Sequence, residues 1–386
     1  MQTPERPVDH PSSPSGLWLL LIPMLFAVLG EFIRYFAYAQ TVDNAALGSF
    51  AQAMCRWDCV WYVRLATEGY DPFPVPSMST AANWAFFPLY PMLIGALQRL
   101  SGLHMMTVAT PVSVLLAILA ARFSWPLLGK DRRAYVLFSA FVLAGPFSMY
   151  FTTFYTEVLF LLLTVCVFAS LRKQRYLLAG IFAALLSGTR IVGVFIVLAI
   201  VLQAFLDHRQ RGGTPLGFVP AVLRRPDLLL AIFIAPLGLF AYMAFLHFHI
   251  GDALAFRHVQ RAWGRATGNP LGYLWTALTT FPVGTWMPRV SQQLAASWIV
   301  GMAMIVVLAI RRHYPAALFC FVCLMLPLFA GMASMLRFVV GLAPITQTAS
   351  TLLARWWPLF WLALAVILVG NYYGTVGWLT GVLTLV

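Results

Sequence analysis

Long apolar runs alternate with short polar segments along the whole chain. Most of these runs are about 17–25 residues long, enough for a helix to cross the hydrocarbon layer of a membrane. The run over 176–206 is interrupted by Ser187-Gly188-Thr189-Arg190, which predicts two short helices that meet near Arg190. The other spans are predicted at about 17–37, 107–127, 134–150, 157–171, 228–248, 294–310, 315–331, 338–353 and 357–372. The pattern therefore predicts an all-α polytopic membrane protein with about eleven transmembrane helices.

The composition supports this prediction. Hydrophobic residues make up 61% of the 386 residues and charged residues 10%, whereas a soluble domain is roughly 25% charged. The net charge is +13, and only Lys130 and Lys173 are lysines. In a membrane protein such an excess is typical of cationic cytoplasmic loops that face anionic lipid, so we expect no nucleic-acid partner.

The segment 86–103 decides the predicted orientation. It is apolar but contains Pro88, Pro91 and Arg99. If it spanned the membrane, the basic clusters at 130–133 and 172–175 would lie opposite the N-terminus. If it is an interfacial or re-entrant helix on the outer side, both clusters lie in the cytoplasm with the N-terminus, as the positive-inside rule requires. We adopt the second topology: a disordered cytoplasmic tail over 1–16 and one transmembrane domain over 17–386, with outer loops at 38–106 and 251–292.

The first outer loop contains the strongest catalytic candidate. Asp58 and Tyr62 share one face of a predicted helix, and Trp57 and Trp61 lie beside them. A carboxylate among indole rings is suited to general-base chemistry, because partial desolvation favours its protonated form. An interfacial helix anchored by tryptophan is the alternative interpretation.

The same loop continues into an aromatic and proline-rich motif. Pro88 and Pro91 are three residues apart and interrupt regular helical hydrogen bonding. Together with Phe87 and Tyr90 they predict a bent surface helix beside a lipid groove, and a kinked span is the alternative.

Three charged residues lie at predicted outer ends of other spans. Glu157 begins the span at 157–171, where the helix dipole favours an acid. Arg190 lies at the break described above, and Arg337 begins the span at 338–353. Arg190 either binds a phosphate or forms an ion pair with Glu157.

The second outer loop predicts a short helix after Asp252. Gln260 and Trp263 lie on one face, and Arg257, Arg261 and Arg265 form a ladder at four-residue spacing. These arginines can bind a phosphate through charge-assisted hydrogen bonds or lie on anionic lipid headgroups.

The cysteines predict neither a metal site nor a disulfide. Cys55 and Cys59 are four residues apart, too close to be bridged readily on one helix. The other three (Cys166, Cys320 and Cys323) lie in apolar runs, without zinc-ligand spacing. We expect buried, unbridged cysteines, and no metal or other cofactor.

The order of these motifs resembles the GPI mannosyltransferase II (PIG-V) family and its bacterial relatives. The resemblance covers about residues 56–345. It rests on Arg56-Trp57-Asp58 with Tyr62, Gly69-Tyr70, Phe86-Phe87-Pro88-Leu89-Tyr90-Pro91, Tyr155-Thr156-Glu157, Arg190 with Gly193, Gly251-Asp252 with Phe256, Gln260 and Trp263, and Ser334 with Arg337-Phe338. The chain departs from the family at Trp61, where members usually have His, and at Tyr155-Thr156-Glu157, where they have Ser-Glu-Ser-like residues.

The resemblance implies a GT-C glycosyltransferase in the bacterial inner membrane, with its active site on the periplasmic side. Such enzymes transfer a hexose, typically mannose, from a polyprenyl-phosphate donor with inversion, and the resemblance implies that Asp58 corresponds to the family's catalytic acidic residue in the first outer loop. The expected partners are this donor, a hydroxyl acceptor on a lipid, glycan or protein, and membrane lipids. The alternatives are a non-catalytic partner in a glycan-assembly complex and a lipid or solute transporter.

Overall fold

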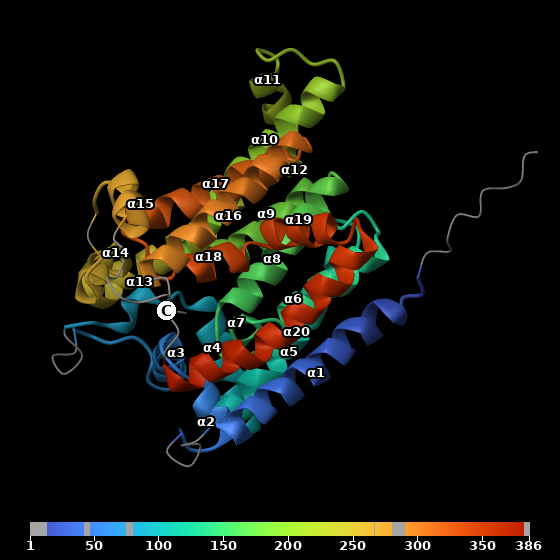
Figure 1. The fold of residues 1–386 in the computed structure, drawn as a ribbon. Helices are drawn as coiled ribbons and strands as arrows, with labels where there is room; N and C mark the ends of the chain where they lie inside the picture. Colours follow the sequence, from blue (N-terminus) through green and yellow to red (C-terminus); the bar gives the residue numbers. More distant parts are fainter. Residues whose placement is uncertain (1–13, 42–46, 75–79, 266, 280–289, 382–386) are drawn as a thin grey trace, which may run out of the picture.

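The described part of the chain is helical. The computed structural model describes residues 14–41, 47–74, 80–265, 267–279 and 290–381, and it contains no β-strand in these ranges. Most of the predicted tail over 1–16 therefore lies outside the described residues. Figure 1 shows long helices packed side by side, with α10 and α12 extending to a protruding α11.

Within the described ranges, six helical segments are long and apolar enough to cross a membrane. They are α1 (Trp18–Gln40), α5 (Met105–Ser124), η4 with α10 (Ile191–Phe195, Ile196–Gln210), α12 with α13 (Pro226–Ile234, Leu237–Ile250), α16 (Val290–Ile310) and α20 (Trp357–Thr380). A polytopic membrane protein is thus confirmed.

The prediction of eleven full-length spans is not established. The span predicted at 338–353 is instead a bent pair, α18 (Met335–Gly341) and α19 (Ala343–Leu353), with an angle of 71° between them. The other predicted spans correspond to shorter helices, namely α6 (Arg132–Ala144) followed by α7 (Met149–Thr152), α8 (Glu157–Arg172), α9 (Tyr176–Ser187) and α17 (Tyr314–Leu328). Of these, α8 is buried along most of its length, at the centre of the bundle.

Short elements connect the long helices. They are α2 (Phe50–Met54), α3 (Asp58–Glu68), η3 (Asn83–Ala85), α4 (Leu89–Ser101), α11 (Phe218–Leu223), α14 (Ala255–His258), η5 (Val259–Trp263) and α15 (Pro270–Thr279). The 13-residue α4 packs on α3 and is not among the candidate spans.

A glycine and a buried arginine of α1 contact α6 and the segment that follows it. A Cβ at Gly30 would lie only 2.1 Å from the carbonyl oxygen of Leu143 in α6. Arg34 is buried; it pairs with Glu31 at 2.5 Å and donates to the Ser148 hydroxyl at 2.6 Å. These contacts fix the bend between α6 and α7, which precedes α8.

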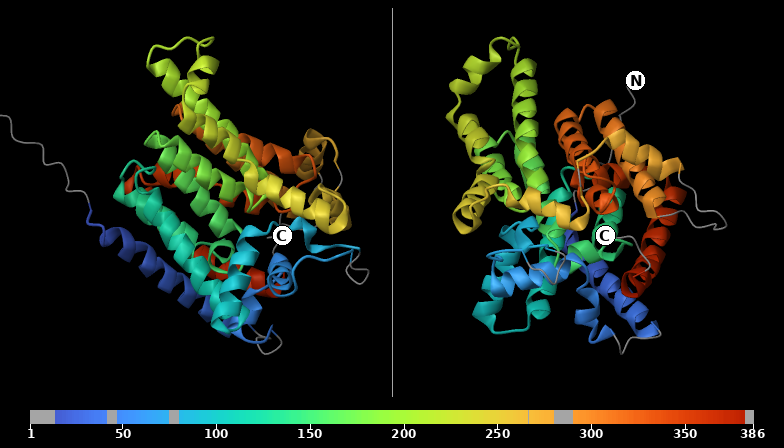
Figure 2. Two further views of the ribbon diagram at one scale, coloured as in Figure 1. Left: turned by 180° about the vertical axis from the view of Figure 1, so that it is seen from behind. Right: turned by 90° about the vertical axis from the view of Figure 1, so that its left-hand side faces the viewer.

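The chain runs repeatedly between two ends of the bundle. At one end, α3 lies near the start of α8, as the contact between Tyr62 and Thr156 shows, and the end of α20 contacts α2 through Trp378 and Met54. At the other end lie the turns that follow α8, α10 and α16, with Arg172, Arg209 and Arg311. We call these the Asp58 end and the basic end. Figure 2 shows the two arms of the bundle, with α10, α12 and α13 in one and α16 to α20 in the other.

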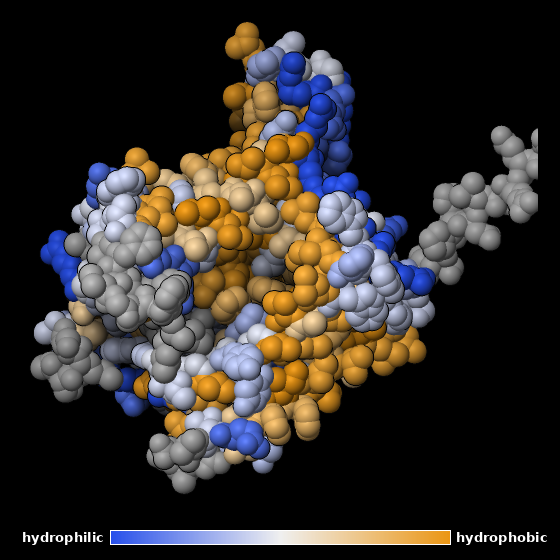
Figure 3. Space-filling model, in the orientation of Figure 1, coloured by the Kyte–Doolittle hydropathy of each residue, from blue (hydrophilic) through white to orange (hydrophobic). Residues whose placement is uncertain are grey.

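Apolar residues cover much of the face seen in Figure 3. Exposed apolar side chains of the long helices include Val28 and Phe32 of α1, Phe233 of α12 and Leu362 of α20. The face seen in Figure 3 is hollowed near its middle, between α18, α19 and α20. An apolar surface of this kind is unfavourable in water and is typical of one that faces lipid.

Candidate functional site

A disulfide bends the chain just before Asp58. Cys55 and Cys59 are bonded, with their Cα atoms 5.2 Å apart. The prediction of unbridged cysteines at these two positions was wrong because the residues do not share one helix. Cys55 ends α2, Trp57 has a positive φ of 56°, and α3 begins at Asp58. Positive φ is uncommon for a bulky residue and is tolerated where the surroundings fix it.

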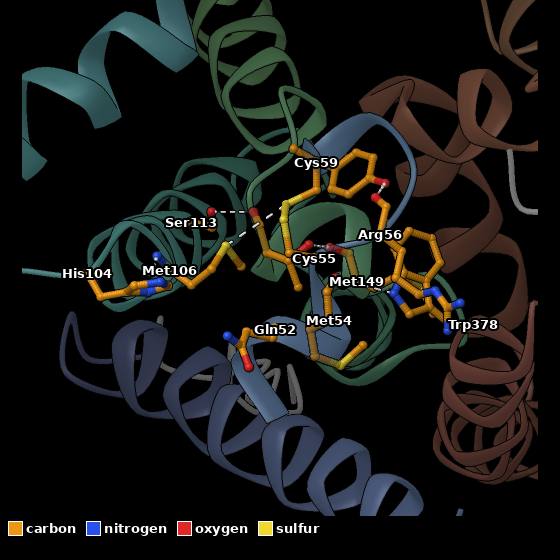
Figure 4. Close-up of a disulfide and its surroundings, with 12 residues drawn as sticks. Gln52, Met54, Cys55, Arg56, Cys59, His104, Met106, Ser113, Met149 and Trp378 are labelled. Atoms are coloured by element: carbon orange, nitrogen blue, oxygen red, sulfur yellow. Dashed lines mark hydrogen bonds between the residues drawn. A yellow bond between two sulfur atoms is a disulfide. The ribbon is translucent and has the colours of Figure 1, made fainter. Parts of the chain in front are cut away.

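Neighbouring helices hold this bend from two sides. The Trp378 indole donates to the carbonyl oxygen of Met54 at 3.3 Å, and the Arg56 guanidinium donates to that of Leu379. The Tyr155 hydroxyl donates to the carbonyl oxygen of Arg56 at 2.6 Å. Figure 4 shows the disulfide between α5 and α20, with Met106 directed toward Cys59. The position of Asp58 is therefore set by α5, α20 and the segment before α8.

Two carboxylates and two arginines meet at the Asp58 end. Arg337 Nη1 lies 2.5 Å from Asp58 Oδ2, and Arg337 Nε lies 3.0 Å from Glu157 Oε1. Arg190 Nη1 lies 2.5 Å from the same Glu157 oxygen. We call Asp58, Glu157, Arg190 and Arg337 the acid–arginine cluster. It joins four segments that are distant in sequence.

The local structure explains how each charge is placed. Asp58 and Glu157 are the first residues of α3 and α8, where the helix dipoles stabilise negative charge. Arg190 precedes η4 in an extended conformation, at the break that the sequence predicted. Its guanidinium lies 5.0 Å from the ring centre of Phe338, and Arg337 lies 5.9 Å from that of Tyr155.

The cluster is largely withdrawn from solvent. Glu157 is fully buried and Arg337 nearly so, whereas the Asp58 side chain is 21% exposed. Glu157 Oε2 is buried and accepts no hydrogen bond from any residue that the structure describes. Buried polar atoms without a partner are costly, and in native proteins they are concentrated at functional sites. Asp58 is thus the cluster's accessible carboxylate.

A fifth charge is Arg265, the third arginine of the predicted ladder. Its Nη2 donates to the Ser334 hydroxyl at 3.1 Å, and its Nη1 to Gln260 Oε1 at 3.4 Å. Burial lowers the pKa of Arg265, and the positive charges of Arg337 and Arg190 act in the same direction. Its spacing of four residues from Arg261 was the available signal, but only the fold shows that Arg265 alone of these arginines turns inward.

Aromatic rings form a wall beside the cluster. Trp61 stacks on Phe86 with ring centres 5.7 Å apart, and Trp263 meets Trp61 edge-on at 5.6 Å. The Tyr62 hydroxyl lies 3.1 Å from that of Thr156. Burial raises the pKa of Tyr62, and the charges of Glu157 and Asp58 raise it further, so the phenol stays neutral. Trp57 lies at the bend and is partly exposed.

Three predicted phosphate or pocket residues do not join the cluster. Asp252 accepts from the His258 ring at 2.7 Å and from the Leu254 backbone, and the bond to His258 lowers the pKa of Asp252. Arg257 and Arg261 are exposed on α14 and η5. Gln260 reaches the cluster only through Arg265.

The residues of the predicted lipid groove at 87–91 lie largely inside the protein. Tyr90 is fully buried and its hydroxyl lies 2.5 Å from that of Ser113. Phe87 packs against the rings of Tyr242 and Phe256, and Pro91 is buried too. Pro88 caps the start of α4. Phe87 and Tyr90 pack the start of α4 against α5 and α13, so their apolar surface is buried in protein.

The described residues contain no group of three or more His, Cys, Asp or Glu side chains that is arranged to hold a metal ion. Comparisons of the chain with protein-family models, with curated proteins and with solved structures found no match. The site's chemistry therefore has to be argued from its geometry.

The arrangement combines a base and anion-binding groups. Asp58 and Glu157 carry two negative charges, and Arg190, Arg337 and Arg265 carry three positive charges, which leaves a surplus of one. A partly exposed carboxylate next to surplus guanidinium groups suits a reaction in which a hydroxyl loses its proton while an anionic group departs.

Proposed function

We propose that the protein is an integral membrane glycosyltransferase of GT-C type. It transfers a hexose, mannose being the first candidate, from a polyprenyl-phosphate donor to a hydroxyl acceptor with inversion. The observation that carries the proposal is the acid–arginine cluster, in which the partly exposed Asp58 lies 2.5 Å from the buried Arg337. The order of motifs that resembles the GPI mannosyltransferase II family supports the same assignment.

The charge of the cluster suits the donor. A sugar linked to a lipid phosphate is a phosphodiester with one negative charge, which matches the surplus of one positive charge. Arg190 and Arg337 pair with carboxylates, whereas the described partners of Arg265, Ser334 and Gln260, are neutral. The charge of Arg265 is therefore the most available to an anionic ligand. We assign to Arg265, Arg190 and Arg337 the stabilisation of charge on the departing phosphate.

Asp58 takes the role of general base. It accepts the proton of the acceptor hydroxyl as this oxygen bonds to the anomeric carbon. The bond between that carbon and the phosphate oxygen breaks, and polyprenyl phosphate leaves with the electron pair. Trp61, Phe86 and Trp263 supply an aromatic surface of the kind that stacks on sugar rings.

The disulfide supports a location on an oxidising side of the membrane. Disulfides persist outside the cytoplasm and are rare within it. The basic turns lie at the opposite end, as the positive-inside rule requires of cytoplasmic loops. Both arguments support our assignment of the Asp58 end to the periplasmic side of a bacterial inner membrane, with a cytoplasmic N-terminus.

The first test is native mass spectrometry of the detergent-purified protein. We expect a co-purified polyprenyl phosphate or its hexose conjugate, lost in Arg265→Ala and Arg190→Ala but retained in Asp252→Asn. If only bulk phospholipid is found, and added polyprenyl-phosphate mannose gives no mass shift, the assembly-partner or transporter alternative replaces the proposal.

The second test separates binding from chemistry. Asp58→Asn keeps the shape of the side chain but cannot accept the proton. We expect turnover in a sugar-transfer assay to fall by roughly 10²–10⁴-fold, the usual contribution of a general base, with donor binding retained. Asp252→Asn is the matched control and keeps its turnover. Near-normal turnover in Asp58→Asn refutes the base assignment.

A further inference from the structure

A separate cavity lies at the basic end of the molecule. Its volume is about 510 Å³, within the range of small-ligand pockets. The lining comes from the C-terminal ends of α8, α10 and α16, the start of α17 and one face of α19. Glu157 and Arg172 are the first and last residues of α8, so the 16-residue helix separates this cavity from the acid–arginine cluster by roughly 24 Å.

The cavity is amphipathic. Its apolar lining includes Phe168 of α8, Leu206 of α10 and Ala316 of α17. Its polar lining includes Arg172, Arg311, Arg312 and His313. Hydrocarbon contacts and cationic contacts are thus available in one pocket.

The positive charges of this cavity have no counterion among the described residues. No described carboxylate lies within 4.0 Å of the guanidinium nitrogens of Arg172, Arg311 or Arg312. Arg311 donates to the Thr351 hydroxyl at 2.7 Å, and Arg172 to a backbone carbonyl.

The acid in the lining, Asp207, forms no ion pair with these arginines. Asp207 accepts hydrogen bonds from Tyr176 and, at 2.8 Å, from Gln203. Burial lowers the pKa of His313, and the positive charges of Arg311 and Arg172 lower it further. An anion bound among these side chains relieves their mutual repulsion.

We propose that this cavity binds the phosphate headgroup of an anionic phospholipid, with Arg172, Arg311 and Arg312 on the phosphate and the lipid's apolar part against Phe168, Leu206 and Ala316. Basic pockets between transmembrane helices are sites for such headgroups. A lipid satisfies both halves of the lining, whereas free phosphate satisfies only the arginines. This proposal does not depend on the glycosyltransferase assignment, since it concerns a different site and a binding readout.

The test uses the full-length protein in detergent, titrated with phosphatidylglycerol or phosphatidylcholine of the same acyl chains and followed by native mass spectrometry. We expect phosphatidylglycerol to bind in preference to phosphatidylcholine, and R311Q/R312Q to weaken its binding by roughly tenfold or more. The matched control is R209Q/R224Q, which removes two exposed arginines at the same end but outside the cavity lining. An equal loss in this control means non-specific surface attraction and overturns the proposal.

Two further variants keep the result interpretable. R311K/R312K retains the charge, so we expect it to keep most of the phosphatidylglycerol binding. This variant distinguishes the effect of lost charge from the effect of misfolding. A316W fills the cavity while leaving every arginine in place, and we expect it to abolish phosphatidylglycerol binding. Unchanged binding in A316W overturns the cavity as the site. If inorganic phosphate displaces phosphatidylglycerol at comparable concentration, the site is one for free anions and the lipid assignment fails.

Discussion

At the scale of single residues, Arg337 is the centre of the candidate site. It contacts both Asp58 and Glu157, which come from different helices. Because Arg337 is nearly buried, removing its charge leaves Asp58 without its ion-pair partner, while Glu157 keeps Arg190. The second cation at Glu157 is Arg190, while Asp58 has Arg337 as its ion-pair partner in the described structure.

We therefore predict that Arg337→Gln destabilises the protein by about 3 kcal/mol, the low end for breaking a buried pair, because Arg190 still compensates Glu157. Thermal or denaturant unfolding in detergent measures this. The double variant Arg337→Gln with Asp58→Asn recovers part of the loss, since it no longer leaves Asp58 charged and unpaired. Arg224→Gln, at an exposed position, is the control and stays within about 0.5 kcal/mol of the wild type. Wild-type stability of Arg337→Gln would contradict the central role of this residue.

At the scale of elements, the junction of α2 and α3 is the unusual feature. A disulfide, a positive φ at Trp57 and hydrogen bonds from Tyr155 and Trp378 all act within a few residues of Asp58. Such reinforcement is more than a surface turn needs. We interpret it as a device that fixes the orientation of the Asp58 carboxylate.

Removing the disulfide tests this interpretation. We expect C55S/C59S to lose roughly 2 kcal/mol of unfolding free energy, because the closed loop is short. We also expect its sugar-transfer turnover to fall by a larger factor than its folded fraction. The measurement pairs turnover with an unfolding curve at the same temperature. Cys166→Ser, at a buried cysteine outside the junction, is the control. Alkylation of the wild-type protein before and after reduction reports whether the bridge exists. Full turnover in C55S/C59S would remove its positioning role.

At the scale of the whole molecule, the two ends of the bundle differ in kind. The Asp58 end holds paired acids and arginines, aromatic rings and the disulfide. The basic end holds arginines that lack carboxylate partners among the described residues, together with the cavity. This difference between the two ends fits a protein inserted in one orientation, with the proposed sugar transfer on one side of the membrane and the proposed anionic lipid on the other.

Cysteine labelling in intact and permeabilised bacterial cells measures this orientation. We predict that a cysteine at Thr67 in α3 reacts with a membrane-impermeant reagent in intact cells whose outer membrane admits it. A cysteine at Lys173 reacts only after the inner membrane is permeabilised. The reverse labelling pattern would contradict the orientation.

The sequence alone determined the features that follow from local chemistry. Apolar runs and scarce charge predicted a polytopic helical membrane protein, and the break before Arg190 was predicted correctly, because hydrophobicity and helix-breaking residues act within a few positions. It also singled out Asp58, Glu157, Arg190 and Arg337 as candidates. Only the tertiary structure decided that these four meet, that Arg265 joins them while Arg257 and Arg261 do not, and that Phe87 and Tyr90 are core rather than groove. It also decided the Cys55–Cys59 bond, because the sequence gives no sign of the sharp bend at Trp57. Such contacts join segments far apart in the chain or depend on one backbone angle, and hydrophobic periodicity carries information about neither.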